Sequence, residues 1–204
     1  RFVGAAAEAR RLAEARLAQA PSDTLSLFAM SHNYALVGNY AFMVDKAYIS
    51  ALRAANRARR YSDRLREIDP EFVDAYLVAG AQEYVVGGLP WALRAVVALG
   101  GIRGNKDKGR EWVEYVAKKG KLLNVEARML LALLYRREYR PMEPAQLLEG
   151  LVQQFPRNYV LRLELASMYL DANETRRGLD NLLAAERMVR NNEHRYARMP
   201  ERLR

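Results

Sequence analysis

The amino-acid sequence predicts an all-α protein made of repeated pairs of antiparallel helices, about ten helices in all. Two observations carry this prediction. A short motif, Leu131-Ala132-x-x-Tyr135, recurs later in the chain as Leu165-Ala166-x-x-Tyr169. In addition, Gly, Pro and Asn residues interrupt the apolar stretches at intervals typical of helix length.

The spacing of the motif identifies the kind of repeat. Ala166 follows Ala132 by 34 residues, the period of the tetratricopeptide repeat (TPR). Each such repeat is a helical hairpin, with helices A and B, and the hairpins stack into a right-handed solenoid. The two helices pack closely only where a small residue lies at their crossing and larger apolar residues flank it. The sequence therefore predicts a TPR-like α-solenoid.

Two regular repeats are predicted, at residues 125–158 and 159–192. In the first, Ala132 is the small residue of helix A, and Pro144 must lie in the first turn of helix B to be tolerated. Helix B then offers Leu148 and Leu151 before Pro156. In the second repeat, five residues are in phase with the pattern: Ala166, Tyr169, Gly178, Leu182 and Ala185.

An atypical repeat is predicted upstream, at residues 71–121. Helix A is expected at Val73–Val86 with Gly80 at the crossing, and helix B at Lys106–Lys119 with Gly109 at the crossing. The stretch Leu89–Asn105 is then an insertion between the two helices, and it starts after Gly and Pro residues that end helix A.

A further atypical repeat is predicted at residues 21–70. Its helix A is expected at Thr24–Val37, capped by Asp23 and ended by Gly38-Asn39, and its helix B is an Arg-rich helix at about Val44–Ile68. Residues 1–20 form an Ala-rich remnant of a preceding repeat, and residues 193–204 a C-terminal extension. No linker divides the chain, so we expect a single domain over residues 1–204.

Composition and charge restrict the classes of function. Hydrophobic residues make up 50% of the chain and charged residues 28%, as in folded proteins. No apolar run reaches the roughly 20 residues of a membrane-spanning helix. The net charge of +9, carried mostly by Arg, favours an anionic partner, although arginines on solvated helix faces are the simpler explanation. The chain begins at Arg1 without a methionine, so we expect that a segment precedes it.

The sequence argues against an enzyme and against a bound metal or cofactor. The two histidines, His32 and His194, lie far apart and lack further ligands at helical spacing. Because the chain has no cysteine and only these two histidines, neither a Cys-His nor a Ser-His-Asp set can be argued. The Gly-rich stretch 100–106 lacks the Lys-Ser/Thr ending of a phosphate-binding loop and follows an apolar helix. We expect it to be a turn that leads to a helix capped by Asn105 or Asp107.

Several segments together resemble a family of bacterial TPR proteins with no assigned activity. They are Asp69-Pro70-Glu71-Phe72-Val73-Asp74-Ala75-Tyr76, Gly104-Asn105-Lys106-Asp107-Lys108-Gly109, Val125-Glu126-Ala127-Arg128 and Phe155-Pro156-Arg157-Asn158. The same order of features is distantly similar to the eukaryotic inclusion-body clearance family. The resemblance covers about Pro21–Leu170 and implies a helical-repeat fold with an interaction role. It also implies export to the periplasm or a membrane-associated location.

Three sets of residues are candidates for binding. Helix A side chains are expected to line a concave groove for a protein or peptide, namely Asn33, Tyr34, Tyr76, Gln82, Arg128, Tyr135, Arg162 and Tyr169. The apolar insertion, with Trp91, Arg94 and Val96, either fills space between helices or docks on a partner or membrane surface. A basic stripe follows one helix face through Arg53, Arg57, Arg60 and Arg64.

The leading functional hypothesis is a non-enzymatic scaffold or adaptor that binds a protein partner. A second hypothesis is an exported carrier that encloses a small apolar or lipid ligand with the insertion at residues 89–105. A third is a binder of anionic membranes or RNA that uses the basic stripe; nucleic acid is the less favoured partner, because no motif that reads bases accompanies the stripe.

Overall fold

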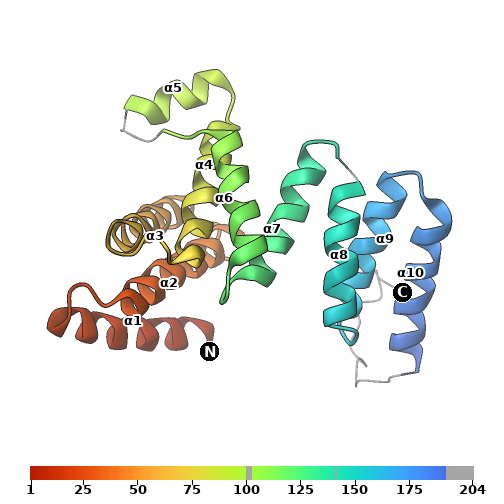
Figure 1. The fold of residues 1–204 in the computed structure, drawn as a ribbon, viewed down its shortest axis with the longest axis horizontal. Helices are drawn as coiled ribbons and strands as arrows, with labels where there is room; N and C mark the ends of the chain where they lie inside the picture. The colour runs from red at the N-terminus through yellow and green to blue at the C-terminus, as the bar shows by residue number, and fades with distance from the viewer. Residues whose placement is uncertain (100–102, 141, 192–204) are drawn as a thin grey trace. The chain divides into compact units, whose positions relative to one another are not determined.

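The computed structural model describes residues 1–99, 103–140 and 142–191 (Figure 1). This part of the chain contains ten α-helices, one short 3₁₀ turn (η1) and no strand. The prediction of an all-α fold is therefore confirmed. Residues 193–204, predicted as a C-terminal extension, lie outside the described residues.

The chain divides into two compact units, unit 1 at residues 1–124 and unit 2 at residues 125–204. Unit 1 contains α1 (Phe2–Gln19), α2 (Thr24–Met43), α3 (Tyr48–Ile68), η1 (Val73–Ala75), α4 (Tyr76–Gly87), α5 (Trp91–Leu99) and α6 (Lys106–Lys119). At the boundary α7 (Asn124–Arg137) begins, and α8 (Met142–Gln154), α9 (Tyr159–Asp171) and α10 (Thr175–Arg190) follow in unit 2. The sequence predicted one undivided domain, whereas the structure separates at the start of the first regular repeat.

The C-terminal end of unit 1 is fixed by Asp74, a buried residue of η1. Its carboxylate accepts hydrogen bonds from the main-chain N–H groups of Lys121, Leu122 and Leu123, at 3.1, 3.1 and 2.7 Å. The side chain of Leu123 is buried as well. Because these bonds hold the chain as far as Leu123, it belongs to unit 1 up to the residue at which α7 begins.

The α2–α3 hairpin corrects one sequence prediction. Gly38 was expected to end the first helix, but α2 continues through it to Met43. A Cβ atom at Gly38 would lie 3.3 Å from the carbonyl oxygen of Ala51 and 3.3 Å from the Cβ of Ala54, both on α3. Gly38 therefore marks the crossing of the two helices rather than a break. Correspondingly α3 begins at Tyr48, after a turn in which Lys46 has φ 55°.

The α4–α6 pair has the closest helix crossing in unit 1. A Cβ atom at Gly109 of α6 would lie 2.3 Å from the main-chain nitrogen of Tyr84 and 2.7 Å from the carbonyl oxygen of Gly80, both on α4. Only glycine permits such an approach of the two backbones. The predicted crossing residues Gly80 and Gly109 are confirmed, and so is Asn105 as the cap of α6, since its side chain accepts from the N–H of Lys108.

In unit 2, the predicted small and apolar residues form one core. It contains Ala132, Ala145, Leu148, Leu151, Val152, Leu161, Leu165, Met168 and Tyr169. Pro144 is buried at the third residue of α8, in the first turn as predicted. Leu182 differs from prediction, because it is 38% exposed while Ala185 is fully buried. In the described part of the chain no helix follows α10 to cover Leu182.

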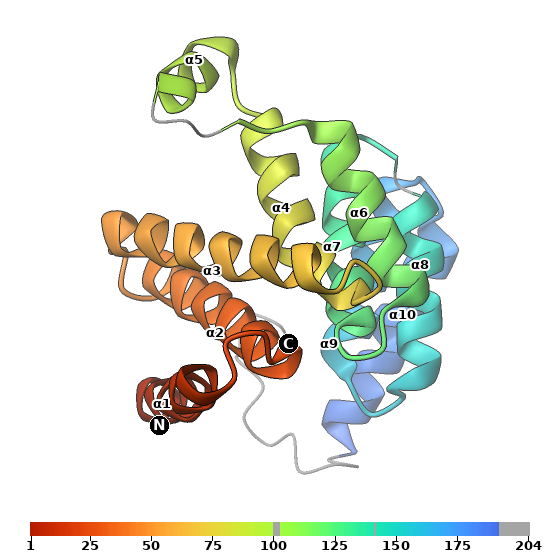
Figure 2. The ribbon, with the colours of Figure 1, turned by 60° about the vertical axis from the view of Figure 1, so that its left-hand side comes forward.

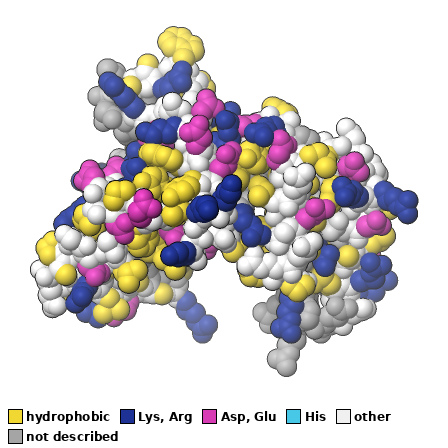
Figure 3. All heavy atoms as spheres, viewed as in Figure 1, with side chains coloured by type: hydrophobic (Ala, Val, Ile, Leu, Met, Phe, Trp, Pro, Cys, Tyr) yellow, Lys and Arg dark blue, Asp and Glu magenta, His cyan; other side chains and the backbone are white. Residues whose placement is uncertain are grey.

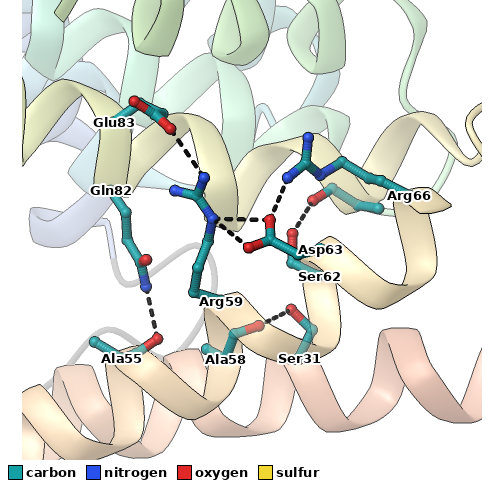
Figure 4. A network of polar contacts seen from close by, with 10 residues as sticks. Ser31, Ala55, Ala58, Arg59, Ser62, Asp63, Arg66, Gln82 and Glu83 are labelled. Carbon is teal, nitrogen blue, oxygen red and sulfur yellow. Dashed lines mark hydrogen bonds and ion pairs between the residues drawn. The ribbon is translucent and has the colours of Figure 1, made fainter. Parts of the chain in front are cut away.

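A polar network holds α3 against its neighbours in unit 1 (Figure 4). Arg59 donates to both carboxylate oxygens of Asp63 and, at 2.9 Å, to Glu83 of α4. Glu83 is nearly buried and also accepts from the main-chain N–H of Asn105, at 2.9 Å. Gln82 of α4 donates to the carbonyl of Ala55 at 2.7 Å. These contacts set the register of α4 along α3.

Candidate functional site

The sequence predicts four groove residues in unit 1, and three of them make hydrogen bonds to main-chain carbonyl groups of the same unit. Asn33 is buried and donates to the carbonyl oxygen of Ala6 at 2.8 Å, which ties α2 to α1. Gln82 is committed to the main chain of α3, as described above. Tyr76 is half-buried, and its hydroxyl donates to the carbonyl oxygen of Pro70 at 3.1 Å. Asn33 and Gln82 thus hold helices together, and a part for these three residues in partner binding stays a prediction.

Tyr34, the fourth predicted residue, is the centre of an arginine cluster. The guanidinium of Arg10, from α1, and that of Arg57, from α3, each lie 5.5 Å from the centroid of the Tyr34 ring. Arg57 also donates to the Tyr34 hydroxyl, at 3.4 Å. The Tyr61 ring stacks on the Tyr34 ring, with centroids 5.9 Å apart. Three helices thus converge on one tyrosine, and the sequence did not reveal the contribution of Arg10.

The basic stripe on α3 lies on an exposed face, as its spacing predicted. Arg53, Arg57, Arg60 and Arg64 are all exposed, and Arg64 donates to the carbonyl oxygen of Pro21 at 2.7 Å. Among the described residues none of these four, nor Arg10, has an ion-pair partner. We call these five residues the arginine face. By contrast, Arg59 and Arg66 of the same helix pair with Asp63.

The electrostatics of Tyr61 show which charges surround this face. Burial raises the pKa of its hydroxyl above the ordinary value, and so do Tyr34 and the carboxylate of Glu14 on α1. Arg57 and Arg64 act in the opposite direction, because positive charge favours the ionised phenolate. Glu14 is thus an acidic side chain beside an otherwise cationic surface.

In unit 2, the predicted residues Arg128, Tyr135 and Arg162 are half-buried. Arg128 of α7 donates to Gln154 of α8 at 3.2 Å, and the guanidinium of Arg140 lies over the Tyr135 ring at 4.4 Å. The Nε atom of Arg162 is buried without a hydrogen-bond partner. A part for Arg128, Tyr135 and Arg162 in partner binding stays a prediction.

A different stripe of α7 and α9 faces outward, next to the predicted one. Met129 and Leu133 of α7 are 50% and 48% exposed, and Val160 and Leu170 of α9 are 48% and 44% exposed. Arg136 of α7 connects the two helices through an ion pair with Asp171 (2.9 Å) and a hydrogen bond to Ser167 (3.2 Å). The sequence contained part of this signal, because Met129 and Leu133 are four residues apart and Leu133 and Leu170 each directly follow a residue of the buried motif.

Tyr169 is buried, and its hydroxyl donates to the carboxylate of Glu149. Burial, then this hydrogen bond and the negative charge of Glu149, raise its pKa to about 12. We expect Tyr169→Phe to lower the free energy of unfolding by about 1–2 kcal/mol at neutral pH, since a hydrogen bond to a charged group is lost. Urea unfolding followed by circular dichroism measures this difference.

The same substitution tests the raised pKa of Tyr169. In the unfolded chain a tyrosine ionises near pH 10, whereas folded Tyr169 stays protonated to about pH 12. Its contribution to stability is therefore complete below pH 10 and is lost as the pH rises from about 10 to 12. The difference between the wild type and Tyr169→Phe should shrink over that range; a difference that stays constant would contradict the assignment.

The apolar insertion forms a separate helix, α5. Trp91 is 79% exposed and Leu93 54%, and Arg94 is exposed with a hydrogen bond of 3.4 Å to the carbonyl of Gly87. These side chains contradict the expectation that the insertion fills space between the helices. The side chain of Val96 lies outside the described residues.

The route of the chain explains why α5 is exposed. A Cβ atom at Gly104 would lie 2.5 Å from the main-chain nitrogen of Gly87. The segments that lead into and out of the insertion are therefore in contact. This narrow neck places α5 beyond the end of α4 instead of along its side. Both ribbon views show α5 standing away from α1, α2 and α3 (Figures 1 and 2).

The structure gives less support to the other candidate sites. In residues 1–99, 103–140 and 142–191, no group of three His, Cys, Asp or Glu side chains is placed to hold a metal ion. None of the helices described is long and apolar enough to cross a membrane. An open hollow of about 490 Å³ is lined by residues 154–159 in the turn between α8 and α9. It is remote in sequence from the insertion, so it gives no support to the apolar-ligand carrier.

Comparison with known proteins establishes the fold. The chain is similar to two crystal structures of MamA, a TPR-containing protein. In one, the sequence identity is 13% and the TM-score 0.61, and the match covers 97% of this chain and 90% of that one. In the other, the values are 11% and 0.60, with 90% and 88% covered. The fold is thus a TPR-like helical solenoid.

Sequence comparison does not assign the chain to a family. No family model and no curated protein matches the chain. The resemblance to exported bacterial TPR proteins and to the inclusion-body clearance family therefore stays a prediction, as does the periplasmic or membrane-associated location.

Proposed function

We propose that the protein is a non-enzymatic scaffold, and that unit 1 holds an acidic segment of a protein partner against the arginine face. The TPR-like fold supports an interaction role in general. The observation that carries the finer proposal is the arginine face itself. The face has five arginines from two helices without ion-pair partners in the described chain, two of them over the Tyr34 ring, whereas the inward-facing arginines of α3 are paired.

The spacing of the arginines suits an extended acidic segment. Along α3, Arg53 and Arg57 are separated by about 6 Å of helix axis, and so are Arg60 and Arg64. In an extended peptide, alternate side chains lie on one face at about 6.6 Å. Two acidic residues at alternate positions would therefore meet the two arginines of either pair. The guanidinium group favours this pairing, because it binds a carboxylate with two parallel hydrogen bonds.

The surroundings of Tyr34 favour a protein partner over single-stranded nucleic acid. Binding of unpaired bases usually relies on aromatic rings with a free face on which a base can stack. The Tyr34 ring is 6% exposed, with Arg10 and Arg57 over it and Tyr61 stacked on it. It therefore positions the arginines and offers no stacking surface.

The proposal can be tested with a fluorescent oligo-glutamate peptide as the probe. The double variant Arg57→Glu and Arg60→Glu should bind this peptide at least about tenfold more weakly than the wild type, measured by fluorescence anisotropy. Binding to the wild type should also weaken steeply with added salt, because the arginines are exposed.

The matched control reverses two exposed arginines in unit 2, Arg176→Glu and Arg187→Glu, and changes the net charge equally. Its affinity should stay within about twofold of the wild type, as distant surface charges act weakly. Equal loss in both double variants would reduce the effect to net charge and contradict a specific face. Tighter binding of a single-stranded RNA than of the peptide would contradict the class of partner.

A further inference from the structure

One end of unit 1 exposes an unusual set of large apolar side chains. At the tip of the α2–α3 hairpin, every one of six such residues is more than half exposed: Phe42, Met43, Val44, Tyr48, Ile49 and Leu52. They follow one another closely along the end of α2, the turn and the start of α3. The sequence-based reading assigned no role to this hairpin tip.

The exposed helix α5 is a second apolar projection of unit 1 (Figure 1). Because Gln82 bonds to Ala55 and Glu83 to Arg59, while Tyr76 lies beside Arg66, α4 runs antiparallel to α3. The second half of α4 therefore packs against the first half of α3, and α5 follows the end of α4, away from α3 (Figure 2). It adds Trp91 and Leu93, and the last turn of α4 adds Val85, 55% exposed. We call these three residues and the hairpin tip the apolar end.

Cations surround the apolar end. Lys46 lies in the hairpin turn, Arg53 follows Leu52, Arg94 lies on α5, and Arg103 lies in the segment that returns from α5; all four are exposed. Asp45, beside Lys46, is an acidic neighbour. The lobe that contains α5 shows basic and hydrophobic side chains next to each other in the space-filling view (Figure 3).

We propose that the apolar end binds the surface of an anionic lipid bilayer. Apolar side chains bordered by cations are the combination that holds proteins at such surfaces, with apolar groups at the acyl boundary and Lys or Arg at the headgroups. Trp91 and Tyr48 suit this boundary, because their rings are apolar with one polar group. A helix of nine residues, about 13 Å long, cannot span the bilayer, so α5 lies in the interface.

The shape of the apolar end favours a bilayer over a protein partner. A peptide or protein side chain is usually received in a concave apolar pocket. Here the apolar side chains lie on two projections, a hairpin tip and a helix beyond a narrow neck, which can both enter a soft surface. This inference is independent of the proposed acidic partner, because the arginine face uses other residues except Arg53.

Co-sedimentation with vesicles tests the proposal. The wild type should bind vesicles of mixed phosphatidylcholine and phosphatidylglycerol, and bind phosphatidylcholine vesicles at least about tenfold more weakly. The double variant Ile49→Ser and Trp91→Ser should lose at least about tenfold in affinity for the mixed vesicles. Both residues are exposed, so the substitutions leave the core intact. The control Leu179→Ser and Leu183→Ser removes two exposed leucines from α10 and should bind normally.

A second measurement reports insertion directly. Brominated acyl chains should quench tryptophan fluorescence when the protein binds, and Trp91→Phe should abolish the quenching while Trp112 still fluoresces. Unchanged binding by the Ile49/Trp91 variant would overturn the proposal. So would loss of binding only in the Arg57/Arg60 reversal, which would indicate adsorption by charge alone. Saturable binding of a protein at Ile49 and Trp91, without binding of vesicles, would overturn it in favour of another occupant.

Discussion

Replacing Asp74 with alanine should lower the free energy of unfolding of unit 1 by about 4 kcal/mol. The buried carboxylate accepts three main-chain hydrogen bonds from Lys121, Leu122 and Leu123. Bonds to a charged acceptor contribute more than neutral ones, and their loss leaves N–H groups without an acceptor in a partly buried place. Both tryptophans of the chain lie in unit 1, so the urea midpoint of tryptophan fluorescence measures this effect.

Two further substitutions make the Asp74 test specific. Asp74→Asn keeps one oxygen acceptor but points an amide donor at another N–H group. It should therefore lower the free energy of unfolding by less than Asp74→Ala does. Asp69→Ala removes a single exposed bond, to the N–H of Glu71, and should lower the free energy by about 0.5–1 kcal/mol. If Asp74→Ala unfolded at the same urea concentration as Asp69→Ala, the carboxylate would not anchor the end of unit 1.

Gly109→Ala should destabilise unit 1 by about 3 kcal/mol or more. The new Cβ atom would lie 2.3 Å from the main-chain nitrogen of Tyr84 and 2.7 Å from the carbonyl oxygen of Gly80. Both neighbours are backbone atoms of α4, which no side-chain rotation can remove. The two helices must therefore move apart, and this loss exceeds the gain of about 1 kcal/mol from placing alanine in a helix.

Gly4→Ala is the matched control for Gly109→Ala. Gly4 also lies in a helix, α1, but a Cβ atom there would have no neighbour within 4 Å. Without a clash, only the helix propensity acts, and the substitution should raise stability by up to about 1 kcal/mol. The urea midpoints of the two variants should therefore shift in opposite directions from that of the wild type. Two shifts of the same sign would show that the α4–α6 crossing is looser than the structure indicates.

The local sequence pattern was sufficient to predict much of the fold. The hydrophobic periodicity and the small residues at helix crossings can both be recognised within short stretches of the chain. Gly80 and Gly109 were identified as crossing residues although the insertion separates them, since each lies in its own helical pattern. Gly38 was misread as a helix end. Glycine is typical of both a break and a close crossing, and only the presence of α3 against it decides between them.

The sequence could not separate binding side chains from structural ones, for the same reason. Asn33 and Gln82 have the chemistry of a binding groove, but a polar side chain can equally bond a neighbouring helix, and both do. The basic stripe needed only helical spacing and was placed correctly on an exposed face. That Arg10 joins Arg57 over Tyr34 depends on the packing of three helices, and no local signal contains it.

The sequence by itself determined that this protein is an all-α repeat, where α4 and α6 cross and which face of α3 carries the arginines. The reason is that 3.6-residue periodicity and the need for small crossing residues act over one or two turns. Only the tertiary structure decided that the chain divides after Asn124, and that the insertion and the hairpin tip are exposed. These features depend on contacts between residues far apart in the chain, such as Asp74 with Leu123 and Gly87 with Gly104.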